Sequence, residues 1–173
     1  MILDDLERFN IKVHLGGFEY ASIQNRLYDK FGNYNFIMID PKNIAGKLHF
    51  LFAVSRANLH CSQSNMKTKI LSSEIVYQLS TSSNINMAKS QFSISSSSKA
   101  AIMIFIDTDV KIINEALLEI EPFLNIDEYF DGHHVNIKTA DQQLIKTFGL
   151  KNEELKISNI EDAIINSVAI KDF

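Results

Sequence analysis

The side chains with the strongest claim to chemistry are His133-His134, because imidazole nitrogens are common metal ligands. No further ligand follows this pair at a spacing typical of zinc motifs. Neighbouring residues on a strand point to opposite faces, so the two rings are not expected to meet one ion. We therefore interpret the pair as strand-edge histidines and predict neither a metal site nor a cofactor.

Two further groups have the composition of a catalytic site. His60-Cys61 offers a base and a nucleophile, yet adjacent residues in a polar connection rarely reach the geometry that covalent catalysis needs. Asp107 and Asp109 offer two carboxylates, but no Gly-rich phosphate loop or third acid accompanies them. The sequence therefore predicts that the chain is not an enzyme. An enzyme that uses Cys61 or the two histidines is the alternative.

The charges of the chain are unevenly distributed along the sequence. The net charge is −4, yet residues 41–106 contain seven Lys or Arg residues and one acid, Glu74. Such asymmetry indicates either a nucleic-acid face or solvated charges without a role. For a nucleic-acid face, the candidate contacts are Lys42, Arg56, Lys67, Lys69 and Lys89.

Length and composition limit the class of protein. The 173 residues fit one domain, 1–173, and 46% of them are hydrophobic, which is enough for a substantial core. The single cysteine excludes an internal disulfide framework. No apolar run reaches the ~20 residues of a membrane span, and the acidic start of the chain is not a signal peptide. We expect no membrane association and a cytoplasmic and nuclear location.

The elements that position these side chains follow from hydrophobic periodicity. Leu71, Ile75 and Leu79 form one helical stripe, and Met66, Ile70 and Tyr77 form a second apolar patch. A helix over about 66–80 is therefore apolar on two faces and is expected at the centre of the molecule.

Strands are expected at 11–15, 100–106 and 134–138, where apolar residues alternate or run together. Asp40-Pro41 is typical of a helix start, and this helix is predicted to reach about Asn58. The fold class is α+β, with helices packed on a small antiparallel three-stranded sheet.

The central stretch also carries a family pattern. Asn65-Met66-Lys67-Thr68, then Leu71 through Leu79-Ser80, is similar to a motif of the PRPK-binding protein (TPRKB-like) family. Asp40-Pro41 upstream, Asn84-Ile85 with Ala88, and Asp162-Ala163-Ile164 with Lys171-Asp172 continue the pattern in order. The sequence resembles this family over nearly its whole length.

The resemblance implies a non-catalytic role as the small kinase-binding subunit of the KEOPS (EKC) complex, which makes threonylcarbamoyladenosine in tRNA. It implies a partner, a PRPK-type kinase that the subunit binds and activates. The helix after Asp40-Pro41 and the C-terminal helix are implied to meet the kinase, which nominates Phe50, Val54, Ile164 and Val168.

A contact with the acceptor end of tRNA is also implied, and it adds Asn84 to the basic residues of 41–106. Archaeal relatives carry an arginine in the segment that corresponds to Ser82-Ser83-Asn84-Ile85, and this chain lacks it. A stand-alone RNA-binding module is the alternative function, supported by the charge distribution alone.

Overall fold

The computed structural model describes residues 9–15, 20–31, 35–98, 100–120 and 141–171. The chain divides into two compact units. The first, here the sheet unit, comprises Leu3–Lys42 and Ser93–His134 with Met1, and the second, the helical unit, comprises Asn43–Phe92 and Val135–Phe173 with Ile2. Each unit combines separate stretches of chain, so no single linker divides the sequence into the two units. The expectation that residues 1–173 form one domain stays a prediction.

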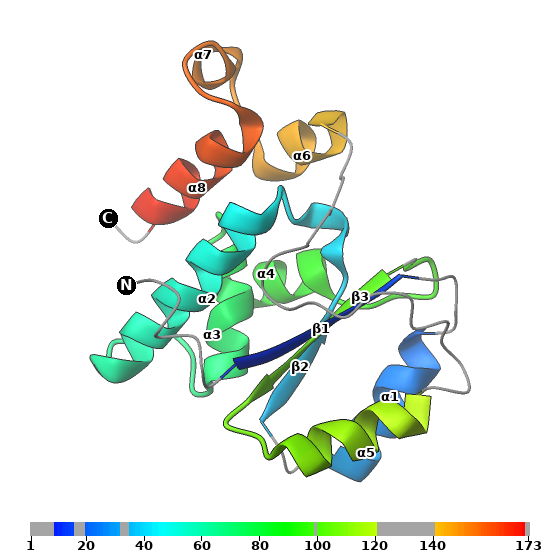
Figure 1. Ribbon diagram of the computed structural model, residues 1–173. Helices are drawn as coiled ribbons and strands as arrows, with labels where there is room; N and C mark the ends of the chain where they lie inside the picture. The colour runs from blue at the N-terminus through cyan, green and yellow to red at the C-terminus, as the bar shows by residue number, and fades with distance from the viewer. Residues whose placement is uncertain (1–8, 16–19, 32–34, 99, 121–140, 172–173) are drawn as a thin grey trace. The chain divides into compact units, whose positions relative to one another are not determined.

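The sheet unit contains an antiparallel sheet, which confirms the α+β class (Figure 1). The described strands are β1 (Phe9–Leu15), β2 (Phe36–Ile39) and β3 (Ala100–Ile106), in the order β1-β3-β2. The predicted strands at 11–15 and 100–106 fall within β1 and β3. The predicted strand at 134–138 lies outside the described residues. Strand β2, at a stretch where no strand was predicted, pairs with β3. The predicted set of three strands is therefore not confirmed.

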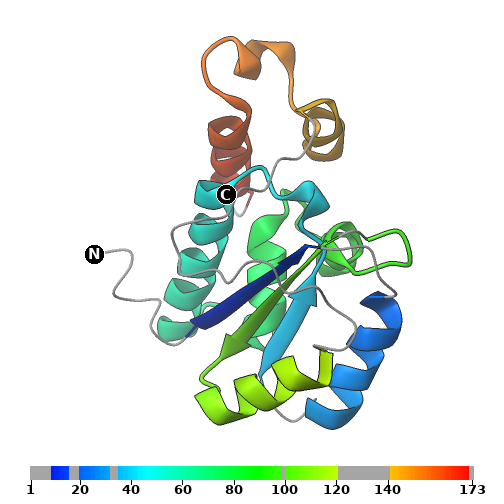
Figure 2. The ribbon, with the colours of Figure 1, turned by 45° about the vertical axis from the view of Figure 1, so that its right-hand side comes forward.

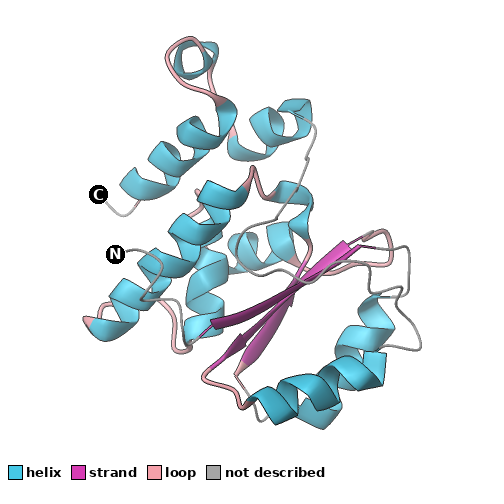
Figure 3. Cartoon of the chain, viewed as in Figure 1, coloured by secondary structure: helices cyan, strands magenta, loops and turns pink. Residues whose placement is uncertain are grey.

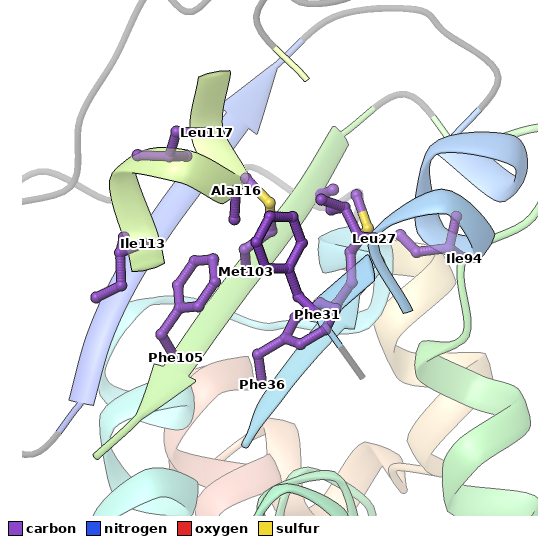
Figure 4. Packing of buried hydrophobic residues seen from close by; sticks show 11 residues of the cluster. Leu27, Phe31, Phe36, Ile94, Met103, Phe105, Ile113, Ala116 and Leu117 are labelled. Atoms are coloured by element: carbon purple, nitrogen blue, oxygen red, sulfur yellow. The ribbon is translucent and has the colours of Figure 1, made fainter. Parts of the chain in front are cut away.

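Helices α1 (Tyr20–Phe31) and α5 (Val110–Ile120) lie against one face of this sheet (Figures 1 and 2). Alternate residues of β3 point to that face, where they join side chains of both helices (Figure 4). The buried cluster comprises Leu27, Phe31, Phe36, Met38, Ile94, Ala101, Met103, Phe105, Ile113, Ala116 and Leu117. The β2–β3 register places Phe36 opposite Phe105, and their rings stack with centroids 5.7 Å apart. Because side chains alternate in direction along the apolar strand β3, one set of them packs into the core of this unit.

In its described part, the helical unit consists of helices joined by loops (Figure 3). These helices are α2 (Lys47–Ser62), α3 (Leu71–Leu79), α4 (Ile85–Phe92), α6 (Asp141–Phe148), α7 (Asn152–Leu155) and α8 (Ile160–Ile170). A single 3₁₀ turn, η2 (Pro41–Asn43), precedes α2 at the boundary between the two units.

The predicted central helix corresponds to α3, and all nine of its residues are buried. It begins at Leu71 and not at residue 66, because the backbone of the preceding residues hydrogen-bonds to the side chain of Glu74. Helix α2 likewise begins at Lys47 and not after Asp40. Asp40 caps the short η2 turn and not α2, because its Oδ1 accepts a hydrogen bond from the backbone N–H of Lys42 at 2.9 Å.

Helix α8 lies alongside α2 and runs in the same direction (Figures 1 and 2). Its N-cap is Asn159, whose Oδ1 accepts a hydrogen bond from the backbone N–H of Asp162 at 2.9 Å. Asparagine at the cap and two acidic residues, Glu161 and Asp162, in the first turn are typical of a helix start.

Candidate functional site

Helix α2 has one buried face and one exposed face. Its fully buried residues include Phe50, Ala53, Val54 and Ala57. At about 100° per residue, Leu48, Phe52 and Leu59 lie on the opposite side of the helix. Leu48 is 58% exposed, Leu59 is 51% exposed and Phe52 is half-buried. These three residues form an apolar surface, which we call the α2 stripe.

The residues that the resemblance assigned to the kinase contact are Phe50 and Val54 on α2, and Ile164 and Val168 on α8. All four side chains are 0% exposed and belong to the core. Both faces of α2 are apolar in sequence, and the face that carries Phe50 is the one turned inward. None of the four side chains is thus accessible to a partner in the structure, and the expectation that α2 and α8 meet a kinase stays a prediction.

Charged side chains attach α8 to α2 at both ends. Near the start of α2, Glu161 Oε1 accepts a hydrogen bond from the backbone N–H of His49 at 2.9 Å. The carboxylate thus serves as an N-cap that Gly46, which has no side chain, does not supply. Towards the end of α8, Arg56 Nη1 donates to the carbonyl of Val168 at 3.0 Å. The negative Glu161 thus lies at the positive end of α2, and the positive Arg56 lies at the negative end of α8.

A third contact joins α8 to the end of α3. The ammonium group of Lys171 donates to the carbonyl of Ser80 at 2.8 Å and to that of Tyr77, and it lies over the Tyr77 ring. Lysine is well placed there, since the last carbonyls of a helix are its negative end.

His49 connects the start of α2 with the end of α3. Its Nδ1 accepts from the backbone N–H of Ala45 at 3.2 Å, and its Nε2 donates to the carbonyl of Leu79 at 3.0 Å. Burial lowers the pKa of His49 to about 4, the bond to Leu79 acts in the opposite direction, and the positive charge of Lys171 lowers the pKa further. The ring is therefore neutral and serves as a structural bridge.

The connection between α2 and α3 is organised by one buried carboxylate. Glu74 is 0% exposed, and its Oε2 accepts from the backbone N–H groups of Lys67 and Thr68, each at 3.0 Å, and from Thr68 Oγ1 at 3.1 Å. Its Oε1 accepts from Gln78 Nε2 at 2.8 Å and lies 3.2 Å from His60 Nδ1. We call residues 66–70 the Glu74 loop. In the sequence, Glu74 stood out only as the single acid of 41–106, and its burial was not predicted.

The predicted RNA-binding residues have different surroundings. Lys42 belongs to the sheet unit, where its Nζ lies 3.3 Å from Asp40 Oδ2, and Arg56 binds the end of α8. Lys67 and Lys69 are exposed on the Glu74 loop.

The remaining two residues of that set lie on and before α4. Lys89 is exposed on this helix. Asn84 caps its start, because its Oδ1 accepts from the backbone N–H groups of Asn86 and Met87. Among the predicted RNA-binding residues, the exposed lysines that are nearest to each other in sequence are therefore Lys67 and Lys69, both on the Glu74 loop.

The residues considered for catalysis do not assemble into a site within the described ranges. Cys61 is half-buried, and its neighbour His60 contacts Glu74 and Gln78. Asp109 Oδ1 accepts from the backbone N–H of Lys111 at 2.7 Å, as a side chain does at the start of a helix. His133 and His134 lie outside the described residues. Among the residues that are described, no cluster of three metal-ligating side chains occurs, and no helix is long and apolar enough to span a membrane.

Comparisons with known proteins agree with the pattern in the sequence. Residues 19–172 match the family model "Kinase binding protein CGI-121". The chain is 28% identical to the EKC/KEOPS complex subunit cgi121 of Schizosaccharomyces pombe over 158 residues, which cover 88% of this chain and 87% of that protein. It is also 28% identical to the EKC/KEOPS complex subunit TPRKB of Danio rerio over 144 residues, 78% of this chain and 75% of the relative. Since the family model spans most of its length, the chain belongs to the kinase binding protein CGI-121 family.

Proposed function

We propose that the chain is a non-catalytic subunit of an EKC/KEOPS complex, in which it binds and activates a PRPK-type kinase. The observation that carries the proposal is the α2 stripe: Leu48, Phe52 and Leu59 are exposed or half-buried on a helix whose other face is in the core. Family membership supplies the class of partner, since the family is described as kinase-binding and both relatives are named as complex subunits.

The surroundings of the α2 stripe suit a protein partner. Arg56 connects it to α8, because its guanidinium carbon lies 5.9 Å from the centre of the Phe52 ring while Nη1 binds the carbonyl of Val168. Two residues after Val168, Ile170 is 67% exposed. Apolar side chains surrounded by polar groups are the usual composition of an interface core, in which a few anchors supply most of the binding energy.

The test is a charge on the stripe. We expect Leu48→Asp and Leu59→Asp each to weaken binding to the kinase at least about tenfold, or ~1.4 kcal/mol, because an aspartate in a desolvated interface has no partner. Binding is measured by isothermal titration with the purified kinase, and kinase activation by its rate of ATP hydrolysis with and without the chain.

Leu118→Asp on α5 is the matched control, since Leu118 is an exposed leucine of the sheet unit at 63% exposure. It should bind the kinase as the unchanged chain does, and circular dichroism should show all three variants folded. Wild-type affinity in both stripe variants would show that the α2 stripe is not the kinase contact.

We propose in addition that the Glu74 loop takes part in tRNA contact. The support is that the only acid of residues 41–98 is the fully buried Glu74, so the exposed charges of this stretch are basic. A role in tRNA modification agrees with the cytoplasmic and nuclear location expected from the sequence. The corresponding salt-dependence experiment is described in the Discussion.

A further inference from the structure

The helical unit contains a surface hollow that none of the functions considered above uses. It has a volume of about 490 Å³ and lies among α6, the connection from α7 to α8, and the first turn of α8. Sites that bind small molecules or peptide side chains commonly have volumes of ~300–1,000 Å³. The hollow is therefore large enough to hold one or two side chains of a partner.

The lining of the hollow combines aliphatic side chains with polar ones, and the charged groups among them are acidic. Leu144, Leu155 and Ile160 supply aliphatic surface, while Asp141 and Glu161 supply carboxylates. Among the described residues that line it, none is a lysine or arginine. A group that combines an aliphatic stem with a positive end matches this lining, as the side chains of lysine and arginine do.

The acidic groups retain hydrogen-bonding capacity. Glu161 uses Oε1 for the N-cap of α2, and within the described residues its Oε2 accepts no hydrogen bond. Asp141 is exposed, and in the same described part of the chain its carboxylate forms neither a hydrogen bond nor an ion pair. A cation in the hollow would therefore gain charged acceptors without displacing an ion pair formed by the described residues.

A second apolar group lies beside the hollow. Ile157 is 87% exposed in the connection between α7 and α8, directly before the lining residue Ser158. An occupant that also covered Ile157 would bury aliphatic surface that now faces water, at a gain of ~25 cal/mol per Å². Because the hollow opens at the surface, a chain segment can enter it with one side chain while neighbouring residues cover the rim.

We propose that this hollow is a docking site for a basic segment of a partner protein, in which an arginine or lysine enters the hollow and an adjacent aliphatic residue packs on Ile157. The partner is identified only by this chemistry. The site lies on α6, α7 and α8, and the proposal does not rest on the kinase contact of the α2 stripe.

The probe is a short fluorescent peptide of arginine, leucine and serine, with a matched peptide in which glutamate replaces arginine. Anisotropy titration of the full chain should show saturable binding of the arginine peptide and none of the glutamate peptide. Asp141→Lys should weaken binding more than about tenfold and Asp141→Asn about threefold to fivefold, in line with an exposed ion pair. Ile157→Ser should weaken it about threefold, through lost apolar contact.

Glu153→Lys is the matched control, because Glu153 is an exposed acid of α7 that does not line the hollow. It should leave the affinity within about twofold, since an exposed charge that does not line the hollow is screened by solvent. Equal weakening by Glu153→Lys and Asp141→Lys, or unchanged binding in Asp141→Lys, would overturn the proposal. So would absence of binding, or full competition by spermine at equal concentration, which would assign the hollow to a small polycation.

Discussion

His49 makes the stability of the helical unit depend on pH. The folded-state pKa of this buried base is about 4, below the ordinary value of 6.5, so the unfolded chain binds the proton more readily. Stability must therefore fall as pH decreases through the window from 6.5 to 4, by about 1.4 kcal/mol per pH unit and about 3 kcal/mol in all. Well above pH 6.5 the ring is neutral in both the folded and the unfolded state, so it does not make the free energy of unfolding depend on pH.

We expect urea unfolding of the unchanged chain to show about 2 kcal/mol of this loss between pH 7 and pH 5, beside the contributions of the carboxylates. His49→Gln removes the titrating ring and retains a polar side chain. Its free energy of unfolding should be lower at pH 7, because the bridge between Ala45 and Leu79 is disturbed, yet it should decline less towards pH 5. Parallel pH profiles of the two proteins would contradict the assignment.

At the scale of elements, the N-terminus of α2 depends on a close approach between Gly46 and α8. A Cβ added at Gly46 would lie 2.6 Å from Glu161 Oε1 and 2.7 Å from its Cδ. The glutamate side chain can move away from such a methyl group, but it then loses its bond to His49. We expect Gly46→Ala to lower the free energy of unfolding by about 1–2 kcal/mol, the usual cost of a lost N-cap.

A double-mutant cycle separates this explanation from a general effect of alanine. Glu161→Ala alone should cost a similar amount. In the Glu161→Ala background, Gly46→Ala should cost little, because the carboxylate that it displaces is already absent. Additive losses in urea unfolding would mean that the two residues act independently.

The elements also show where sequence patterns suffice. The apolar run at 100–106 is a local signal, and it predicted a strand where the structure has β3. Helix α2 is apolar on two sides, so periodicity alone could not tell whether Phe50 or Phe52 faces the interior. The start of α3 depends on Glu74, whose carboxylate accepts hydrogen bonds from the backbone N–H groups of Lys67 and Thr68. These bonds form only in the folded chain, so no periodic pattern predicts where α3 begins.

At the scale of the whole molecule, the balance of charge hides a basic stretch. The net charge is −4, yet residues 41–98 expose no acid, because their only carboxylate is the buried Glu74. If the Glu74 loop contacts tRNA, Lys67→Glu and Lys69→Glu should each weaken tRNA binding. Each should also reduce the slope of log affinity against log salt concentration by about 0.7, the value for a single-strand phosphate contact.

Filter binding of tRNA at several salt concentrations measures this slope, with the chain bound to its kinase. Lys156→Glu serves as the control, since Lys156 is also exposed but follows α7, away in sequence from the loop. Identical slopes for the loop variants and the control would remove the Glu74 loop from the RNA contact. Kinase binding should be unchanged in all three variants.

The contact between Glu161 and the start of α2 also constrains the order of events during synthesis on the ribosome. The two bonded residues, His49 and Glu161, are separated by 112 positions. At ~5–20 residues per second, translation takes several seconds to cover that distance. During this interval a nascent α2 lacks both its cap and the helix that packs on it. A ribosome stalled before Ile160 therefore presents an uncapped α2, which is a ready substrate for a chaperone that binds apolar segments.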